Sequence, residues 1–288
     1  MRFEKYFQPQ SIKECQSILT EYGSSAKVLA GGTDLVPRLK NKLIHPTAVV
    51  RLMDIPDMDE TSVTEEGLTL GALANLRDIS LNPELENKYL VVRECCGHVS
   101  SQQVRNIATI GGNACNASPS ADAIHGLLLN DAVCKISGPG GEREVPLCGF
   151  FVGPGKTVLS PDELLVKFFV PAPREHTGAS YKKYAIRGDS DISIVGAGAR
   201  LTLDAEGKIA EARITLASVA PTPVRMIPAE KILAGEKPEA ALFAEAAEIC
   251  AKNVKPITDQ RASKEYRVEM VRVWVRHALE EAWERAVK

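Results

Sequence analysis

The chain has 288 residues, of which 44% are hydrophobic and 25% are charged, and its formal net charge is −2. This length suffices for one large or two moderate domains, and the charge argues against a nucleic-acid partner because no basic excess neutralises phosphates. No stretch approaches the roughly 18 apolar residues of a membrane helix, and no apolar run near the start is typical of a signal peptide. We therefore expect a globular protein of the cytoplasm without a membrane span.

The cysteines indicate a reduced compartment. There are seven, an odd count at irregular spacing, and no C-x-x-C pair is present. Buried thiols fit this pattern better than a disulfide framework does. The adjacent Cys95 and Cys96 are poorly placed to ligate one cluster together, so we predict neither a metal nor an iron–sulfur site in this chain.

The first fifty residues predict a small β-α-β unit. A helix is expected over residues 11–22, with Ser11 as its N-cap and Gly23 after its end. A buried strand is expected at residues 28–30, then a helical or turn segment with three leucines at residues 35–43, then a strand at residues 49–52. A unit of this size is too small to be stable alone, so we expect it to pack against the next part of the chain.

The strand Val28-Leu29-Ala30 leads into the pair Gly31-Gly32, which is followed by Thr33, Asp34 and Leu35. Glycines expose successive backbone N–H groups, which can form a concave site for an anion such as a phosphate. Thr33 and Asp34 could cap the turn or a following helix. A plain glycine turn between two elements is the alternative interpretation.

A second glycine pair lies in the middle of the chain. A hairpin at residues 63–72, a helix from residue 73 and a helix over residues 89–99 precede the motif Thr109-Ile110-Gly111-Gly112-Asn113, after which come Asn116 and Asp122. Asp122 could accept hydrogen bonds from a ribose hydroxyl or a ring N–H. Two such motifs suggest two anion nests that hold one extended diphosphate. Neither motif is G-x-G-x-x-G or a P-loop, which excludes a Rossmann dinucleotide site and an NTPase.

The remaining elements predict an α+β arrangement. A helix at residues 123–129 carries His125, which we interpret as a structural histidine with satisfied hydrogen bonds rather than a ligand contact. Strands are expected at residues 132–136 and 163–171, and the prolines at 171 and 173 mark a linker. Strands at residues 179–186, 192–203 and 209–219 then precede helices at 240–254 and 264–286, which favours an antiparallel sheet with helices on one face.

Together, the two glycine motifs resemble the FAD-binding subunit of the molybdenum hydroxylases, a family that includes the carbon monoxide dehydrogenase medium chain and the xanthine dehydrogenase FAD-binding subunit. Residues 103–106, Ser118-Pro119, residues 220–225 and residues 261–267 are also similar to that family, so the resemblance covers almost the whole chain. It implies a two-part FAD-binding domain of the PCMH type over residues 1–174, with subdomains at about 1–55 and 56–174. A C-terminal domain of the carbon monoxide dehydrogenase flavoprotein type over residues 175–288 would follow.

The resemblance also implies which residues bind FAD. The segments Val28 to Leu35 and Thr109 to Asn113 would hold the pyrophosphate, and Asn116 and Asp122 would lie on the ribityl or adenosine side. Leu165 would touch the cofactor, and Lys182 would lie near the flavin ring, with a solvated strand lysine as the alternative.

The sequence departs from the family pattern at one place. After Gly188-Asp189 many relatives have an aromatic residue, whereas this chain has Ser190-Asp191-Ile192, which is more similar to the xanthine dehydrogenase branch. Because of that departure, the sequence does not determine the electron acceptor, and NAD, a quinone and ferredoxin are the candidates.

No catalytic side chain stands out, which suits a protein whose chemistry belongs to its cofactor. The resemblance implies an FAD-carrying electron-transfer subunit of a molybdenum hydroxylase complex. It would take electrons from an iron–sulfur small subunit, in a complex with a molybdopterin large subunit, and pass them to an external acceptor. One alternative is a stand-alone flavin-dependent oxidase of the same superfamily, which would need its own acid–base residue. Another is a binding module without flavin, against which the intact glycine pairs count.

Overall fold

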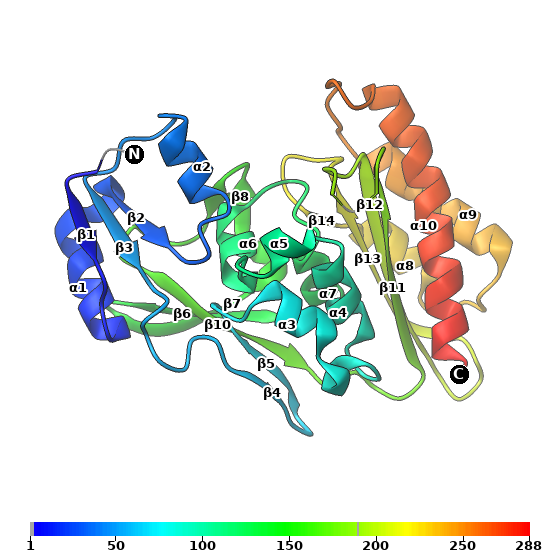
Figure 1. Ribbon diagram of the computed structural model, residues 1–288. Helices are drawn as coiled ribbons and strands as arrows, with labels where there is room; N and C mark the ends of the chain where they lie inside the picture. Colours follow the sequence, from blue (N-terminus) through cyan, green and yellow to red (C-terminus); the bar gives the residue numbers. More distant parts are fainter. Residues whose placement is uncertain (1–2, 189) are drawn as a thin grey trace.

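The computed structural model describes residues 3–188 and 190–288, and the chain forms three regions in sequence (Figure 1). Three residues lie outside the described part of the chain: Met1, Arg2 and Asp189. Asp189 belongs to the segment where the sequence departs from the family pattern. Within the described part of the chain, no helix is both long enough and apolar enough to cross a membrane.

The first region is the expected β-α-β unit. Its parallel sheet has the order β1-β3-β2, and its elements are β1 (Lys5–Phe7), α1 (Ile12–Tyr22), β2 (Ala26–Leu29), α2 (Leu35–Lys40) and β3 (Ala48–Arg51). The Ser11 side chain accepts a hydrogen bond from the Glu14 N–H, and Gly23 ends α1 at φ 52°, which confirms both predicted helix signals. Leu39 is buried, but Leu43 is 69% exposed, so the third leucine of residues 35–43 does not pack on the sheet.

The second region is built on an antiparallel sheet of order β4-β5-β10-β6-β7. Its strands are β4 (Thr61–Val63), β5 (Gly67–Gly71), β6 (Val133–Gly138), β7 (Gly141–Pro146) and β10 (Leu164–Pro171), with a separate pair β8 (Phe151–Gly153) and β9 (Lys156–Thr157). Its helices are α3 (Leu76–Leu81), α4 (Leu90–Gly97), α5 (Gln102–Arg105), α6 (Ile110–Asn116) and α7 (Ile124–Leu129). The sequence did not predict β7. It did not predict α6 either, because α6 contains the glycine pair that indicated a turn.

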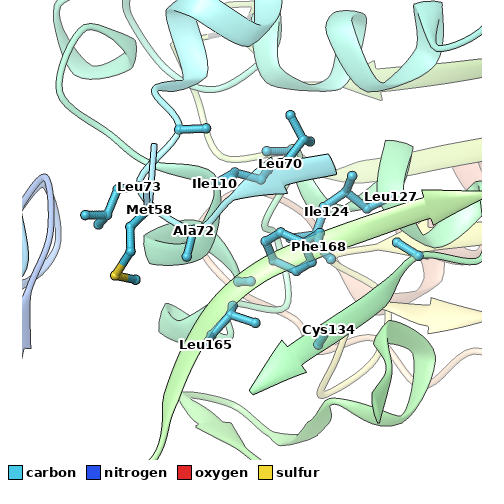
Figure 2. Close-up of a cluster of buried hydrophobic side chains, with 14 of the residues drawn as sticks. Met58, Leu70, Ala72, Leu73, Ile110, Ile124, Leu127, Cys134, Leu165 and Phe168 are labelled. Carbon is cyan, nitrogen blue, oxygen red and sulfur yellow. The ribbon is translucent and has the colours of Figure 1, made fainter. Parts of the chain in front are cut away.

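A row of cross-strand neighbours forms the centre of the main core (Figure 2). Phe168 of β10 lies opposite Leu70 of β5 and Cys134 of β6, and all three side chains are fully buried. Ile110 of α6 and Ile124 of α7 belong to the same buried cluster. Truncating a buried phenylalanine costs about 3–5 kcal/mol, so this row contributes strongly to the stability of the second region.

The third region is the predicted antiparallel sheet with helices. Its order is β11-β12-β13-β14, and its elements are β11 (Thr177–Tyr184), β12 (Val195–Leu203), β13 (Ile209–Ala217), β14 (Val224–Arg225), α8 (Ile227–Leu233), α9 (Ala240–Asn253) and α10 (Lys264–Ala286). These helices pack on one face, and α4 and α7 of the second region pack on the other (Figure 1). Every residue of β12 is therefore buried, which a sheet covered on a single face would not produce.

Candidate functional site

A cavity of about 690 Å³ lies where the three regions meet. Most of the residues that the sequence indicated line it: Val28, Ala30, Gly31, Gly32, Thr33, Asp34, Leu35, Thr109, Gly111, Gly112, Asn113, Asn116, Asp122 and Leu165. Leu29, Ile110 and Lys182 are absent from its lining. The fold thus brings the two glycine motifs, far apart in sequence, to one hollow of a size typical for a cofactor site.

The first glycine motif forms a tight loop between β2 and α2. A Cβ atom on Gly31 would lie 1.7 Å from the carbonyl oxygen of Ile107, so only glycine lets this loop approach the segment before α6. Gly32 has a φ of 75°, a conformation that other residues adopt with strain. Within residues 3–188 and 190–288, the N–H groups of residues 31–34 donate to no protein acceptor. The residues that carry these N–H groups line the cavity, and the N–H groups remain available for an anion.

The second glycine motif is the first turn of α6 rather than an open nest. Thr109 caps the helix, and its Oγ1 accepts from the Gly112 N–H at 3.1 Å. The N–H groups of Ile110 and Gly111 donate to the carbonyls of Ala74 and Ala72 at 3.0 and 2.8 Å. The predicted anion nest therefore does not form at residues 110–112, because the protein itself uses these donors. Ile110 points into the core and is fully buried.

Polar residues from the ends of α2 and α6 line the cavity. Asp34 is the N-cap residue of α2, and Asn116 is the last residue of α6. Burial raises the pKa of Asp34, and Arg38 and Asn116 partly oppose that rise. Asn113 Oδ1 is buried without a hydrogen-bond partner among the described residues. A buried amide oxygen of this kind is costly unless a ligand or water donates to it.

Asp122 is the most buried acid among the described residues that line the cavity. Its side chain is 8% exposed, its Oδ2 lies 2.9 Å from Nζ of Lys183, and its Oδ1 accepts from the hydroxyl of Tyr181 at 2.8 Å. Lys183 Nζ also donates to the carbonyl of His98 at 2.8 Å. Burial raises the pKa of Asp122, and Lys183, Tyr181 and His98 act against that rise. An acid and a cation thus lie side by side at the wall of the cavity.

The lysine of β11 that faces the cavity is Lys183, and the expected Lys182 points the other way. Successive side chains of a strand alternate between the faces of its sheet. Lys182 consequently turns toward α10 and forms an ion pair with Glu281, which also accepts from Ser180 at 2.7 Å. The sequence did not show which of the two adjacent lysines faces the cavity, because either one could point inward.

The segment after β11 lies at the cavity as well. Ser190, Asp191 and Ile192 line it, and Ile192 is 50% exposed. Arg187 and Asp191 form an exposed ion pair at 2.5 Å, closing the turn at Gly188. The cavity is therefore bounded on one side by the C-terminal region.

His125 is fully buried in α7 and does not line the cavity, but neither of its ring nitrogens has a hydrogen-bond partner in the described part of the chain. The expectation of a satisfied structural histidine is wrong in that respect. Its ring stacks on Tyr181, with centroids 5.1 Å apart and an interplanar angle of 16°. Burial lowers its pKa to about 3, so the ring is neutral at physiological pH.

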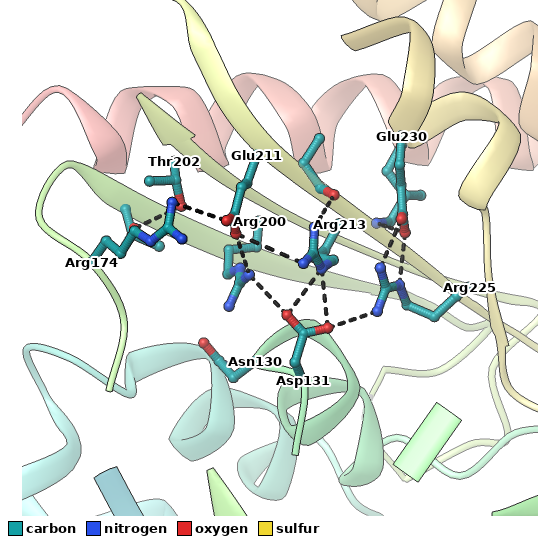
Figure 3. Close-up of polar contacts among 12 residues, drawn as sticks. Asn130, Asp131, Arg174, Arg200, Thr202, Glu211, Arg213, Arg225 and Glu230 are labelled. Carbon is teal, nitrogen blue, oxygen red and sulfur yellow. Dashed lines mark hydrogen bonds and ion pairs between the residues drawn. The ribbon is translucent and has the colours of Figure 1, made fainter. Parts of the chain in front are cut away.

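Three arginines of the C-terminal sheet converge on Asp131, which follows α7 (Figure 3). Arg213, Arg225 and Arg200 approach its carboxylate to 3.0, 2.8 and 3.1 Å. Asp131 has a φ of 53°, which aspartate tolerates better than most residues. Sequence reasoning missed this network because its members lie 69 to 94 residues apart. The network holds the C-terminal region against the region that carries the second glycine motif.

Comparisons with known proteins identify the family. Residues 1–173 match the model of the FAD binding domain in molybdopterin dehydrogenase, and residues 179–282 match that of the CO dehydrogenase flavoprotein C-terminal domain. The chain is 32% identical to the putative xanthine dehydrogenase FAD-binding subunit of Escherichia coli, over 97% of this chain and 96% of that protein. It is also 32% identical to the carbon monoxide dehydrogenase medium chain of Afipia carboxidovorans, over 98% and 97%.

A solved structure gives the same result. Carbon monoxide dehydrogenase from Hydrogenophaga pseudoflava matches with a TM-score of 0.95 and 31% identity, over 99% of this chain and 98% of that chain. The chain belongs to the FAD-binding subunits of the molybdopterin-dependent dehydrogenases. Its cofactor is FAD, and it is an oxidoreductase subunit. The cavity suits this group, because unpaired N–H donors, an orphaned amide oxygen and a buried acid surround one hollow.

Proposed function

We propose that this chain is the electron-transfer subunit of a molybdenum hydroxylase complex. The observation that carries the proposal is the cavity, in which the unpaired N–H groups of residues 31–34 lie opposite α6. The polar groups of the cavity are suited to hold a cofactor, and we find no nucleophile–base pair among the described side chains that line it. When bound, FAD accepts electrons and releases them again.

Each part of the cavity has a role in this proposal. The N–H groups of residues 31–34 hold the pyrophosphate, and the motif of residues 109–113 supplies the wall behind it. Asn116 and Asp122 take the ribityl or adenosine hydroxyls, and Leu165 gives an apolar contact. Lys183, which lines the cavity, replaces Lys182 as the cation near the flavin ring. A cation there stabilises negative charge on the cofactor.

We infer two partners, an iron–sulfur small subunit and a molybdopterin large subunit. The support is that relatives of nearly equal length are named medium chains and complex subunits. Electrons enter from the iron–sulfur subunit and leave to NAD, a quinone or ferredoxin. The cytoplasm is the proposed location, because all seven cysteines are free thiols.

We also propose the domain division at residues 174 and 175, with subdomains at about 1–55 and 56–174. The boundary at residues 174 and 175 is supported by two separate buried clusters, one that ends at Val170 and one that begins at Ile194. Limited proteolysis tests it: initial cleavage within residues 172–176 is expected, and initial cleavage inside β12 would contradict the division.

Two measurements test the function. The purified chain should carry FAD that acid precipitation releases, and a pull-down from the native host should recover a molybdopterin chain and an iron–sulfur chain. Colourless protein that takes up no FAD on titration refutes the cofactor assignment. Recovery of a homo-oligomer that oxidises a small molecule with oxygen by itself favours the oxidase instead.

A further inference from the structure

Tyr181 connects the C-terminal sheet to the acid of the cavity. The residue is 3% exposed, and its hydroxyl donates to Asp122 Oδ1 at 2.8 Å. Lys183, two residues along β11 and therefore on the same face, contacts the other carboxylate oxygen at 2.9 Å. Both oxygens of one carboxylate are thus fixed by two side chains that come from a different region of the fold.

The surrounding structure leaves space for this tyrosine ring. On β12, a Cβ at Gly196 would lie 2.2 Å from the Tyr181 hydroxyl oxygen, and one at Gly198 would lie 3.3 Å from the ring carbon Cδ2. The two glycines of Val195-Gly196-Ala197-Gly198 therefore form a socket, a space in which the Tyr181 side chain of the neighbouring strand fits. His125 covers the ring by stacking at 5.1 Å. This socket holds Tyr181 in one place relative to α7.

We propose that Tyr181 is a positioning residue, which fixes the Asp122 carboxylate so that it accepts hydrogen bonds from the hydroxyl groups of FAD. The inference rests on the proposed function, in which FAD occupies the cavity. Tyr181 itself does not line the cavity, so it acts only through Asp122. Without the tyrosine hydroxyl, the carboxylate is free to rotate toward Lys183, which would turn its acceptor lone pairs away from the cofactor.

The charge of Asp122 depends on the same contact. The titratable groups that face it are Lys183, Tyr181, His98 and, more weakly, Cys95. Burial raises the pKa of this carboxyl, while the Tyr181 hydroxyl lowers it by hydrogen bonding to the ionised form. Removing the hydroxyl raises the pKa further, so Asp122 becomes protonated, and a weaker acceptor, at a higher pH.

The test is Tyr181→Phe in the full chain, with FAD as the probe and flavin fluorescence as the readout of binding across a pH series. We expect an increase of about tenfold in the Kd for FAD, which corresponds to about 1.4 kcal/mol of binding free energy. The pH midpoint of FAD release on acidification should also move upward. Tyr184→Phe is the matched control, because that hydroxyl lies on the same strand but bonds to Tyr266. It should leave both quantities unchanged.

A double-mutant cycle separates positioning from a general structural effect. In an Asp122→Ala background, Tyr181→Phe should cause no further change in the Kd for FAD, because the acceptor that the tyrosine positions is no longer present. His125→Phe keeps a flat ring over Tyr181 and should preserve the wild-type pH profile.

The outcomes distinguish the two proposals. A wild-type chain that never binds FAD refutes the proposed function. A wild-type chain that binds FAD, with a Tyr181→Phe variant of equal Kd and equal pH midpoint, refutes the positioning role alone. If Tyr181→Phe does not fold, Gly196→Ala displaces the hydroxyl by a methyl group at 2.2 Å, and an unchanged pH profile in that folded variant also overturns the inference.

Discussion

Asp131 permits a direct test of how the C-terminal region is held in place. Replacing it with asparagine removes the charge that three arginines share, and it keeps the shape of the side chain. Asparagine also tolerates the positive φ of 53° at this position, so the backbone should not be strained. The substitution Asp131→Asn therefore isolates the electrostatic part of the contact between the two regions.

The magnitude follows from the contacts. Arg213 and Arg225 donate to the carboxylate at 3.0 and 2.8 Å, and Arg200 at 3.1 Å, while the Asp131 side chain is 36% exposed. Removing one partner of a fully buried pair costs about 3–5 kcal/mol, and an exposed pair contributes about 0–1 kcal/mol. Glu230 compensates Arg225, and Glu211 partly compensates Arg200. We expect a loss of about 2–3 kcal/mol for this intermediate case.

The pH dependence has a defined sign. Burial would raise the pKa of Asp131, but Arg213, Arg200 and Arg225 outweigh it and hold that pKa below its usual value. A carboxyl with a lowered folded-state pKa contributes stability that is present above its unfolded pKa of about 3.9 and is lost as the pH falls through its folded pKa. The difference in unfolding free energy between wild type and variant should therefore be full at pH 7 and shrink below about pH 4.

The assay is urea unfolding of the full chain at pH 7, repeated at low pH and at high salt. Asp57→Asn is the matched control, since Asp57 is an exposed aspartate with a φ of 63°. It should change the unfolding free energy by less than about 0.5 kcal/mol. Equal losses for Asp131→Asn and Asp57→Asn at pH 7, or a loss that grows as the pH falls, would refute the reasoning.

Two further predictions concern the cavity. Gly111→Ala should lower the melting temperature more than Gly112→Ala. The new methyl group at residue 111 would lie 2.5 Å from the backbone carbonyl oxygen of Ala72, whereas the one at residue 112 would lie 2.8 Å from the Thr109 side-chain hydroxyl. Equal melting temperatures for the two variants would contradict this ranking. FAD should slow the modification of Cys115 by N-ethylmaleimide, read by peptide mass spectrometry, and should leave Cys148 unaffected. Cys115 lines the cavity and Cys148 does not, so equal protection of both would argue against FAD in this cavity.

Much of the fold could be predicted from local patterns. The capping signals of Ser11 and Gly23, the alternation in β5 and the two long C-terminal helices are read over a few neighbouring residues, and the structure confirms them. The FAD cofactor was predicted from the resemblance of two glycine motifs in the right order, and the family comparison confirms it. Local signals also failed where tertiary contacts overrode them, as at residues 110–112, where α6 replaces the expected loop.

Spatial partners were decided by the tertiary structure alone. The sequence determined that a lysine pair lies on a C-terminal strand, but the phase of β11 decided that Lys183 faces Asp122 while Lys182 faces Glu281. The sequence likewise contained Asp131 without any sign of its arginines, because they come from strands up to 94 residues away. Local propensity extends over a turn or a strand, whereas such pairs depend on how whole layers pack, and that packing is set by the two buried cores together.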